Sequence, residues 1–278
     1  MRVDILSVVC NGMPFIRHHL PVFQALKIPW HWHLYEGIAR NPFAPGSITP
    51  DMHRNGLSVD GTTEYITDHL MWHPNVTVHR VGANWESLYL TARFQHMLSK
   101  VNEQTLAWEV DVDEYWTAAQ IETMARMFDE QPAKTAAWFR CRLFVGPKRM
   151  LPRSDHGPGG RLSHEWKRAW RHRPGLVYAQ HDPPTVLDEN GADVFAKNGF
   201  MHDETENAGL TFNHYAYVTE AQIRFKEQRY GFHGAMKEWK RLQTCALPTT
   251  LGSLIGTTNP GGSSEVIAAP EQHWFKEE

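Results

Sequence analysis

Residues 105–114 read Thr-Leu-Ala-Trp-Glu-Val-Asp-Val-Asp-Glu, an apolar run that passes directly into carboxylates. The run from Thr105 to Val110 has the length and composition of a buried β-strand. Asp111 and Asp113 follow it one residue apart, where the chain turns toward a predicted helix. Because ligands of α/β proteins bind beyond the carboxyl ends of the strands, this acidic pair predicts a ligand site.

Strands and helices alternate in the part of the chain that precedes this stretch. The other strand-like runs are Val3 to Cys10, Trp30 to Tyr35 and Val76 to Val81. Helical stripes of apolar residues lie between the strands: Ile16, Leu20 and Phe23; Tyr65, Ile66 and Leu70; Leu90, Phe94, Met97 and Val101. This order predicts an α/β fold with a mostly parallel central sheet flanked by helices. Asn11, Glu36 and Asp111 would each lie just beyond a strand end.

The second half of the chain contains two capping boxes, each of which predicts the start of a helix. They are Thr117-Ala118-Ala119-Gln120 and Thr219-Glu220-Ala221-Gln222. Further expected segments are a strand over 136–145, Pro- and Gly-rich loops over 39–58 and 147–161, and an irregular tail over 247–278. No internal repeat and no clear linker divides the chain, so we predict one domain over residues 1–246 followed by the tail.

The composition excludes several classes of protein. The chain has 278 residues, of which 41% are hydrophobic and 21% charged, and its formal charge is -3. These values are typical of a globular protein and argue against a nucleic-acid binder. Cys10, Cys141 and Cys245 form no Cys-x-x-Cys pair, which argues against a zinc site or disulfide framework and favours a cytoplasmic location. No run of 18 apolar residues predicts a transmembrane segment, although peripheral membrane contact remains compatible with the sequence.

Charge is unevenly distributed along the chain. Acids dominate between Glu103 and Glu130, whereas the stretch from Arg140 to Arg173 holds ten Lys or Arg against Asp155 and Glu165. An acidic block followed by a basic block suits a site that holds both a divalent cation and phosphates. Two solvated faces of opposite charge would produce the same pattern.

The acidic pair itself favours a hard metal ion. Asp111 and Asp113, with Val112 between them, offer carboxylate oxygens, which suit Mg²⁺ or Mn²⁺. Either ion keeps coordination positions open for substrate phosphates. The ordinary alternative is that acids collect near a helix N-terminus because the helix dipole favours them there.

Four segments, in order, resemble family 2 glycosyltransferases of the GT-A fold, especially the bacterial enzymes that extend lipopolysaccharide core sugars. The first, Ser58 to Ile66, is similar to the family's Ser-x-Asp-Gly-Thr loop and helix, and the second, Glu109 to Glu114, to its Leu-Asp-Ala-Asp-Glu segment. The third, Arg168 to Arg171 with Tyr178 to Asp182, is similar to an Arg-x-x-Arg stretch that leads to a His-Glu pair. The fourth, Asn213-His214-Tyr215 with Lys226 and Arg229-Tyr230, is similar to the family's closing His-Tyr segment. The resemblance covers residues 3–232. The chain departs from the family in its long 39–58 loop and in Asp182, where the family usually has Glu.

The resemblance implies transfer of a sugar from a UDP- or GDP-sugar to a saccharide or lipid-linked acceptor, as in polysaccharide biosynthesis. It places the nucleotide-binding half at residues 1–115 and the acceptor half at 116–246. The residues it implies for the donor are Asn11, Glu36, Asp60, Arg93, Val112 and Lys226, with Arg168 and Arg171 near the leaving diphosphate. The residues it implies for the metal are Asp111, Asp113 and His214.

An inverting transfer needs a base that takes the proton of the acceptor hydroxyl. Asp182, which takes the place of the family's His-Glu acid and precedes Pro183-Pro184, is the predicted base, and Glu165 is the reserve candidate. The alternative is that Asp182 is only a turn residue that precedes proline and has no catalytic role. Because an Asp-x-Asp site serves both stereochemical outcomes, a retaining reaction stays open.

Two further functions remain open from the residues alone. The first is a nucleotidyltransferase of related fold, although Cys10-Asn11-Gly12-Met13-Pro14 lacks the basic Gly-rich loop that such enzymes carry. The second is a non-catalytic module that binds carbohydrate or calcium. Against this reading, Asp111 to Glu114 is too short for an EF-hand loop, which spaces its ligands over about twelve residues.

Overall fold

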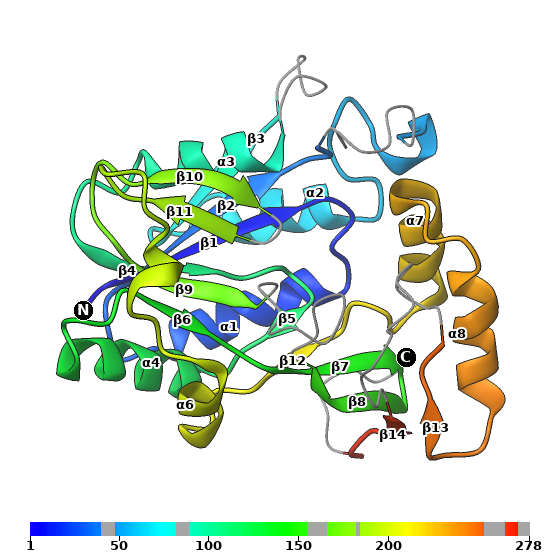
Figure 1. Ribbon diagram of the computed structural model, residues 1–278. Coiled ribbons are helices and arrows are strands. Elements are labelled where there is room, and N and C mark those ends of the chain that lie inside the picture. The colour runs from blue at the N-terminus through cyan, green and yellow to red at the C-terminus, as the bar shows by residue number, and fades with distance from the viewer. Residues whose placement is uncertain (40–47, 82–88, 155–165, 182–183, 253–264, 272–278) are drawn as a thin grey trace.

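The computed structural model describes residues 1–39, 48–81, 89–154, 166–181, 184–252 and 265–271. A central sheet has the strand order β3-β2-β1-β4-β9-β6 (Figure 1). Its strands are β1 (Val3–Val9), β2 (Trp30–Glu36), β3 (Val76–Arg80), β4 (Thr105–Glu109), β6 (Ala136–Trp138) and β9 (Lys167–His172). The first four pair in parallel, and β9 runs antiparallel between β4 and β6. The predicted α/β fold with a mostly parallel sheet is confirmed.

Helices and a small hairpin cover this sheet and extend beyond it. The helical segments are η1 (Phe15–His18), α1 (His19–Gln24), η2 (Pro50–Met52), α2 (Thr62–Tyr65), η3 (Ile66–Leu70), α3 (Leu90–Leu98), α4 (Ala118–Glu130), α5 (Val194–Lys197), α6 (His202–Asn207), α7 (Glu220–Tyr230) and α8 (Ala235–Thr244). The hairpin joins β10 (Val177–His181) to β11 (Pro184–Leu187). Both predicted capping boxes form, at Thr117 and at Thr219.

The two faces of β1 pack against different layers because successive side chains of a strand point to opposite sides. Val3, Ile5 and Val9 belong to the larger core, which includes apolar residues of α1 and α4. Leu6 belongs to a second core formed with α3 and the β10–β11 hairpin. Burial on both faces explains why β1 has an almost continuous apolar sequence.

A second sheet lies beside the carboxyl ends of the central strands, with α7 and α8 packed next to it (Figure 1). Its strand order is β13-β14-β8-β7-β12-β5. Its strands are β5 (Glu114–Tyr115), β7 (Cys141–Gly146), β8 (Arg149–Ser154), β12 (Phe212–His214), β13 (Thr249–Thr250) and β14 (Glu265–Ala268). The described part of the chain contains no helix of the length and apolarity needed to span a membrane.

This second sheet differs from the sequence prediction in three places. The single strand expected over 136–145 is divided between the two sheets, as β6 and β7, and the start of the expected 147–161 loop is strand β8. Buried Met150 and Leu151 stabilise β8 against β7. The expected irregular tail includes β14, whose Val266 is fully buried and which pairs with β8. Prolines and glycines nearby obscured these short pairings.

Four imidazoles lie against one another where β2, β3 and α3 meet. The ring centroids of His31 and His33 are 4.7 Å apart, those of His33 and His79 6.3 Å, and those of His79 and His96 4.9 Å. Burial, aided by the neighbouring histidines, lowers the pKa of His31 and of His79 to about 4. The folded protein therefore holds the rings of His31 and His79 neutral at pH values where an unfolded histidine is protonated.

This cluster predicts acid destabilisation. Because the folded pKa values of His31 and His79 lie below the unfolded value near 6.5, their contribution to stability should be constant above pH 7 and fall as pH drops from 6.5 to 4. We expect a loss of about 2 kcal/mol from His31 and His79, after reducing the linkage value for their partial exposure. Urea unfolding across this range would measure the loss. His79→Phe should flatten the slope, and an unchanged slope would contradict the assignment.

Candidate functional site

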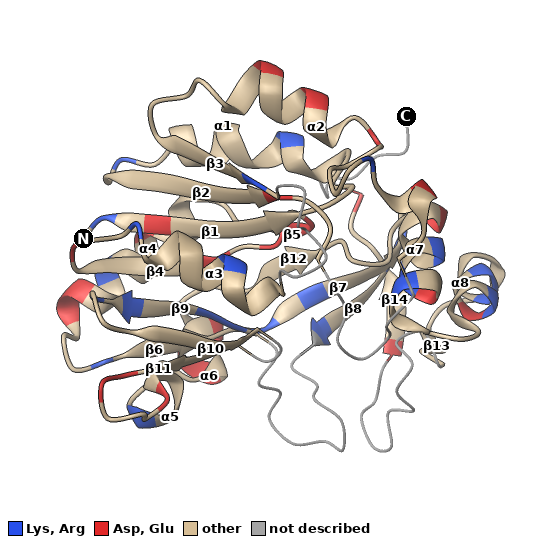
Figure 2. Ribbon diagram, turned by 90° about the horizontal axis from the view of Figure 1, so that it is seen from above, with Lys and Arg blue, Asp and Glu red and all other residues tan. Residues whose placement is uncertain are grey.

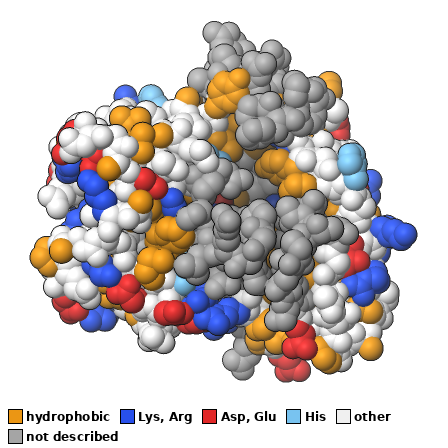
Figure 3. Space-filling model, in the orientation of Figure 1, with side chains coloured by type: hydrophobic (Ala, Val, Ile, Leu, Met, Phe, Trp, Pro, Cys, Tyr) orange, Lys and Arg blue, Asp and Glu red, His pale blue; other side chains and the backbone are white. Residues whose placement is uncertain are grey.

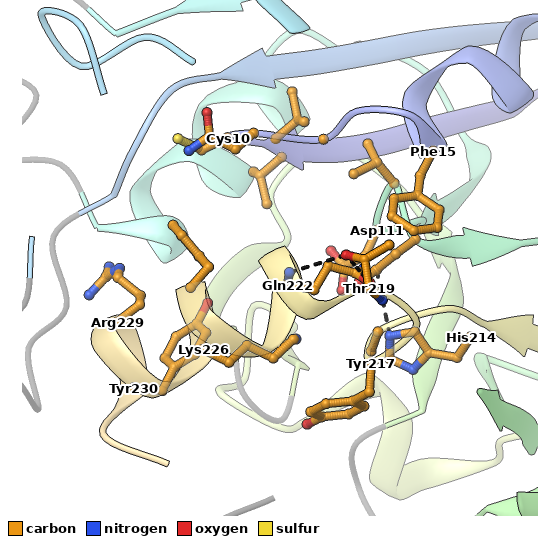
Figure 4. Close-up of a pocket in the computed structure, with 18 of the residues that line it drawn as sticks. Cys10, Phe15, Asp111, His214, Tyr217, Thr219, Gln222, Lys226, Arg229 and Tyr230 are labelled. Atoms are coloured by element: carbon orange, nitrogen blue, oxygen red, sulfur yellow. Dashed lines mark hydrogen bonds and ion pairs between the residues drawn. The ribbon is translucent and has the colours of Figure 1, made fainter. Parts of the chain in front are cut away.

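A cavity of about 1060 Å³ opens at the carboxyl ends of the central strands. It is lined by loop residues that follow β1 and β4, by β12 of the second sheet and by α7. In the view of Figure 4, Asp111 and His214 lie toward one side, Arg229 and Tyr230 toward the other, and Lys226 between them. The described lining includes eight of the residues predicted from the sequence: Asn11, Asp60, Asp111, Val112, Asp113, Arg168, His214 and Lys226.

The backbone of the acidic motif is fixed by hydrogen bonds from other elements. His19 of α1 contacts the Val112 carbonyl through Nε2 at 2.8 Å. The Tyr215 amide, just after β12, donates to the Asp113 carbonyl at 2.8 Å. These contacts hold the motif between the two sheets and leave the Asp113 side chain about one-fifth exposed.

The surroundings of Asp113, one of the three predicted metal ligands, favour its ionised form. Burial alone would raise the pKa of Asp113, but contact with His214 and the charge of Lys226 lower it to about 2. The His214 Nε2 atom lies 3.5 Å from the Asp113 Oδ1 atom. Asp113 is therefore a carboxylate at any physiological pH.

Arg168 of β9 engages the acids around the motif. Its guanidinium donates to both oxygens of Glu114, through Nε at 2.9 and 3.0 Å and Nη2 at 2.6 Å, and lies 3.4 Å from Asp111 Oδ2. Nη1 lies 3.6 Å from Glu109 Oε1. These buried carboxylates raise the pKa of Arg168 well above its usual value despite the cost of burial. Acids of the 103–130 block thus pair with a base of the 140–173 block.

The donor set fits a metal ion that binds together with phosphates. Among the described residues, no group of three or more His, Cys, Asp or Glu side chains converges to hold a metal. The three predicted ligands Asp111, Asp113 and His214 therefore form no ready-made cage, since Arg168 engages Asp111. Mg²⁺ typically binds through only one or two protein carboxylates plus substrate phosphates. Ionised Asp113 with partly exposed Asp111 meets that requirement.

The loop after β1 is fixed by the segment that leads into α2. The Asn11 side chain donates to the Met52 carbonyl at 2.8 Å and accepts from the Val59 amide at 2.9 Å. Asp60 accepts from the Met13 amide at 2.9 Å and, through its other oxygen, from the Thr62 amide at 3.0 Å. Asn11 and Asp60 therefore shape this wall of the cavity.

Glu36 and Arg93 are not among the described residues that line the cavity. Glu36 is fully buried at the end of β2, where it accepts from Arg80 Nε at 2.8 Å and from the Thr63 hydroxyl. Arg93 of α3 is buried and donates to the carbonyls of Gly37 and Ile38. Burial lowers the pKa of Arg93 to about 10. Both side chains support the end of β2 from behind the wall.

Helix α7 supplies the cationic and aromatic side of the cavity. Lys226 Nζ lies 4.8 Å from the centre of the Tyr217 ring, and Arg229 donates to the Ala39 carbonyl. Both α7 and α8 carry acidic and basic residues (Figure 2), and Arg224 of α7 pairs with Glu220. On the face in Figure 3, acidic and basic side chains are interspersed.

Several predicted residues lie elsewhere or cannot be placed. Arg171 donates to the carbonyls of Phe128, Lys134 and Gln131, at the opposite end of β9 from the cavity. The predicted base Asp182 and the reserve Glu165 lie outside the described residues.

Sequence reasoning missed three residues that form a polar cluster at the cavity wall, Glu109, Tyr178 and His181. Burial raises the pKa of Glu109 to about 8, although Arg168 opposes this shift. Two signals were available: a glutamate inside the otherwise apolar strand of residues 105–110, and the segment from Tyr178 to Asp182, which was matched to the family without a role for Tyr178 or His181.

No protein-family model and no curated protein sequence matches the chain. Among solved structures, it is similar to S. aureus TarS 1–349 in complex with UDP-GlcNAc, with 15% identity, a TM-score of 0.43, and coverage of 62% of this chain and 45% of that chain. It is also similar to the mannosyltransferase PcManGT from Pyrobaculum calidifontis in complex with GDP-Man and Mn2+, with 12% identity, a TM-score of 0.46, and coverage of 89% and 66%. A CMP:2-keto-3-deoxy-manno-octonic acid synthetase complexed with CTP aligns at 13% identity and a TM-score of 0.34, over 62% of this chain and 72% of that chain. The chain thus spans less than half the length of the TarS structure, and its function has to be argued from its own residues.

Proposed function

We propose that the protein is a metal-dependent glycosyltransferase that moves a sugar from a nucleoside-diphosphate sugar to a hydroxyl of a saccharide or lipid-linked acceptor. One observation carries this proposal. Asp113, ionised and partly exposed, lies with His214 and Lys226 on the wall of a large cavity at the carboxyl ends of parallel strands. That arrangement suits a diphosphate and its divalent cation.

Different residues of the chain would bind the nucleoside, hold the metal ion and stabilise the leaving diphosphate. We place the nucleoside against the loop after β1 and Asp60, and the acceptor on the side formed by residues after 115. Asp113 and Asp111 would hold Mg²⁺ or Mn²⁺, which supplies positive charge to the leaving diphosphate. Lys226 and His214 would stabilise the same developing charge at fixed positions, where preorganised groups act most strongly. We infer an inverting transfer, which requires a base on the acceptor side.

A thermal-shift experiment tests this function directly. A true donor at 100 times its Kd stabilises the folded state by about 2.7 kcal/mol, which raises the Tm of a chain of this size by roughly 5 to 10 °C. We expect this rise with UDP- or GDP-sugars only when Mn²⁺ is present. An Asp113→Asn variant should lose it.

Product analysis separates the proposal from its alternatives. A glycosyltransferase releases free nucleoside diphosphate when an acceptor is added, whereas a nucleotidyltransferase releases pyrophosphate from a nucleoside triphosphate. Donor binding without turnover in the presence of a panel of acceptors would favour a binding module. The absence of any donor-dependent shift would overturn the proposed function.

A further inference from the structure

Tyr230, the last residue of α7, lines the cavity beside the groups that the proposed function uses. It follows Lys226 by one helical turn, so the two side chains are neighbours on the helix, as Figure 4 shows. Side chains of a helix lean toward its N-terminus, which directs the Tyr230 ring back over the turn of Lys226. A contact with the Phe225 ring, at 6.5 Å between centroids and 83° between planes, agrees with this direction.

Ring contacts hold Tyr230 in place and leave its hydroxyl available. The Phe232 ring lies 5.6 Å from the Tyr230 ring, and the Arg229 guanidinium 5.6 Å from its centre. Among the residues that the structure describes, none forms a hydrogen bond with the hydroxyl; the contacts of Tyr230 are made by its ring. A tyrosine hydroxyl in this situation can donate its hydrogen to a ligand.

The groups that act on the pKa of Tyr230 indicate where its hydroxyl lies. Tyr230 is 47% exposed as a residue, yet burial around the hydroxyl raises its pKa, an effect that Arg229 opposes. Asp111, Asp113 and Cys10 raise the pKa further. The two acids belong to the proposed metal site, whereas Cys10 follows β1 beside the proposed nucleoside wall. The hydroxyl therefore lies within electrostatic reach of both, and it keeps its proton at neutral pH.

A diphosphate would connect these two ends of the cavity. In the proposed function the metal binds at Asp113 and the nucleoside lies against the loop after β1, so the diphosphate lies between them. Lys226 is close enough to Asp113 for its charge to lower the Asp113 pKa. The C-terminal end of a helix is the negative end of its dipole, so side chains have to supply the attraction for an anion there. Lys226 would supply a positive charge, and Tyr230 a neutral donor.

We propose that Tyr230 is a catalytic residue that donates a hydrogen bond to the departing diphosphate of the sugar donor; this inference rests on the proposed function. The acceptor oxygen forms a bond to the anomeric carbon as the bond from that carbon to the diphosphate oxygen breaks. The electron pair of the broken bond stays with the diphosphate, and the acceptor proton goes to the base on the acceptor side. Tyr230 gives up no proton. Its hydrogen bond strengthens as negative charge develops on the diphosphate.

The position of Tyr230 is compatible with an inverting transfer. In such a reaction the nucleophile attacks the anomeric carbon from the face opposite to the leaving group. Contacts with the leaving group can therefore share one wall of the cavity, while the base lies across from them. Tyr230 is on the wall that also carries Lys226, so the two would act on the same diphosphate.

Tyr230→Phe tests the assignment, because phenylalanine keeps the ring contacts with Phe225 and Phe232 and removes only the hydroxyl. We expect kcat to fall about 10- to 100-fold, the range for loss of one hydrogen bond to a charged group, with Tm unchanged. Calorimetry with Mn²⁺ should show weaker binding of free UDP or GDP. Binding of uridine or guanosine, which carry no phosphate, should be unaffected, a difference that a merely structural role would not produce.

Tyr65→Phe is the matched control. Tyr65 of α2 is a partly buried tyrosine whose ring contacts His69 and Arg17, and it is not among the described residues that line the cavity. Its replacement should leave kcat and the affinity for UDP or GDP at their wild-type values.

Tyr230→Leu separates the role of the hydroxyl from that of the ring. If Tyr230→Phe keeps more than about half of wild-type kcat and diphosphate affinity while Tyr230→Leu loses donor binding, the ring packs against the donor and the proposed hydrogen bond is wrong. Equal losses of nucleoside and diphosphate affinity in Tyr230→Phe would also overturn it. If the wild-type protein neither binds nor turns over any donor, the proposed function fails instead.

Discussion

Asp113→Asn is expected to lower kcat for sugar transfer by about 1000-fold, or roughly 4 kcal/mol of barrier, with little change in Tm. The asparagine keeps the shape of the side chain but removes the charge that would hold the cation. Asp113 is partly exposed and its backbone carbonyl contact with the Tyr215 amide is unaffected, so the fold should tolerate the change. Steady-state kinetics across a Mn²⁺ titration would measure the effect.

Asp111→Asn is the informative comparison. Arg168 already engages the Asp111 carboxylate, so this variant should lose less activity than Asp113→Asn and should respond more to added Mn²⁺. Equal activity of both variants and the wild type in excess chelator would contradict a metal role for the motif. A large fall in Tm for Asp113→Asn would instead indicate a structural acid.

Arg168→Met is expected to lower the free energy of unfolding by about 3 to 5 kcal/mol. Arg168 is buried and is the cation that faces Glu109, Asp111 and Glu114. Methionine fills much of the volume but leaves these acids without their counter-charge. Urea unfolding at pH 7.5 would give the loss directly.

Arg126→Met provides the control for loss of an arginine. Arg126 forms an exposed pair with Glu130 on α4, and such pairs contribute little, so its replacement should change stability by less than about 1 kcal/mol. If Arg168→Met had an equally small effect, the neighbouring carboxylates would have to become neutral by taking up protons. The buried ion cluster would then not be a determinant of stability.

The sequence predicted those parts of the fold in which the signal is local. Strands β1 and β4 are buried on both faces and have largely apolar sequences, and α4 and α7 begin at capping boxes in which Thr117 and Thr219 accept from backbone amides. Strand β14 gave no such signal. It is short and pairs with β8 more than a hundred residues earlier, a contact that no local pattern encodes.

The residues of the candidate site likewise separate into those with a local sequence signal and those without one. Asp111 and Asp113 were predicted because they follow the end of a strand, and Asp60 because it lies in a recognisable motif before a helix. Glu36 also follows a predicted strand, but in the structure its side chain pairs with Arg80 and does not line the cavity. The Glu109 contacts with Tyr178 and His181 join β4 to the β10–β11 hairpin across about 70 residues. Such a pairing depends on the path of the chain between them.

The antiparallel position of β9 beside β4 has a consequence for synthesis of the chain. During translation, β4 emerges with its outer edge unpaired and stays so until residues 167–172 leave the ribosome. An open strand edge is a template for pairing with other chains, and non-local pairing forms slowly. A fragment that ends at residue 115 would keep that edge permanently. We therefore expect it to aggregate, so the proposed nucleotide-binding half should not be obtainable as a separate soluble protein.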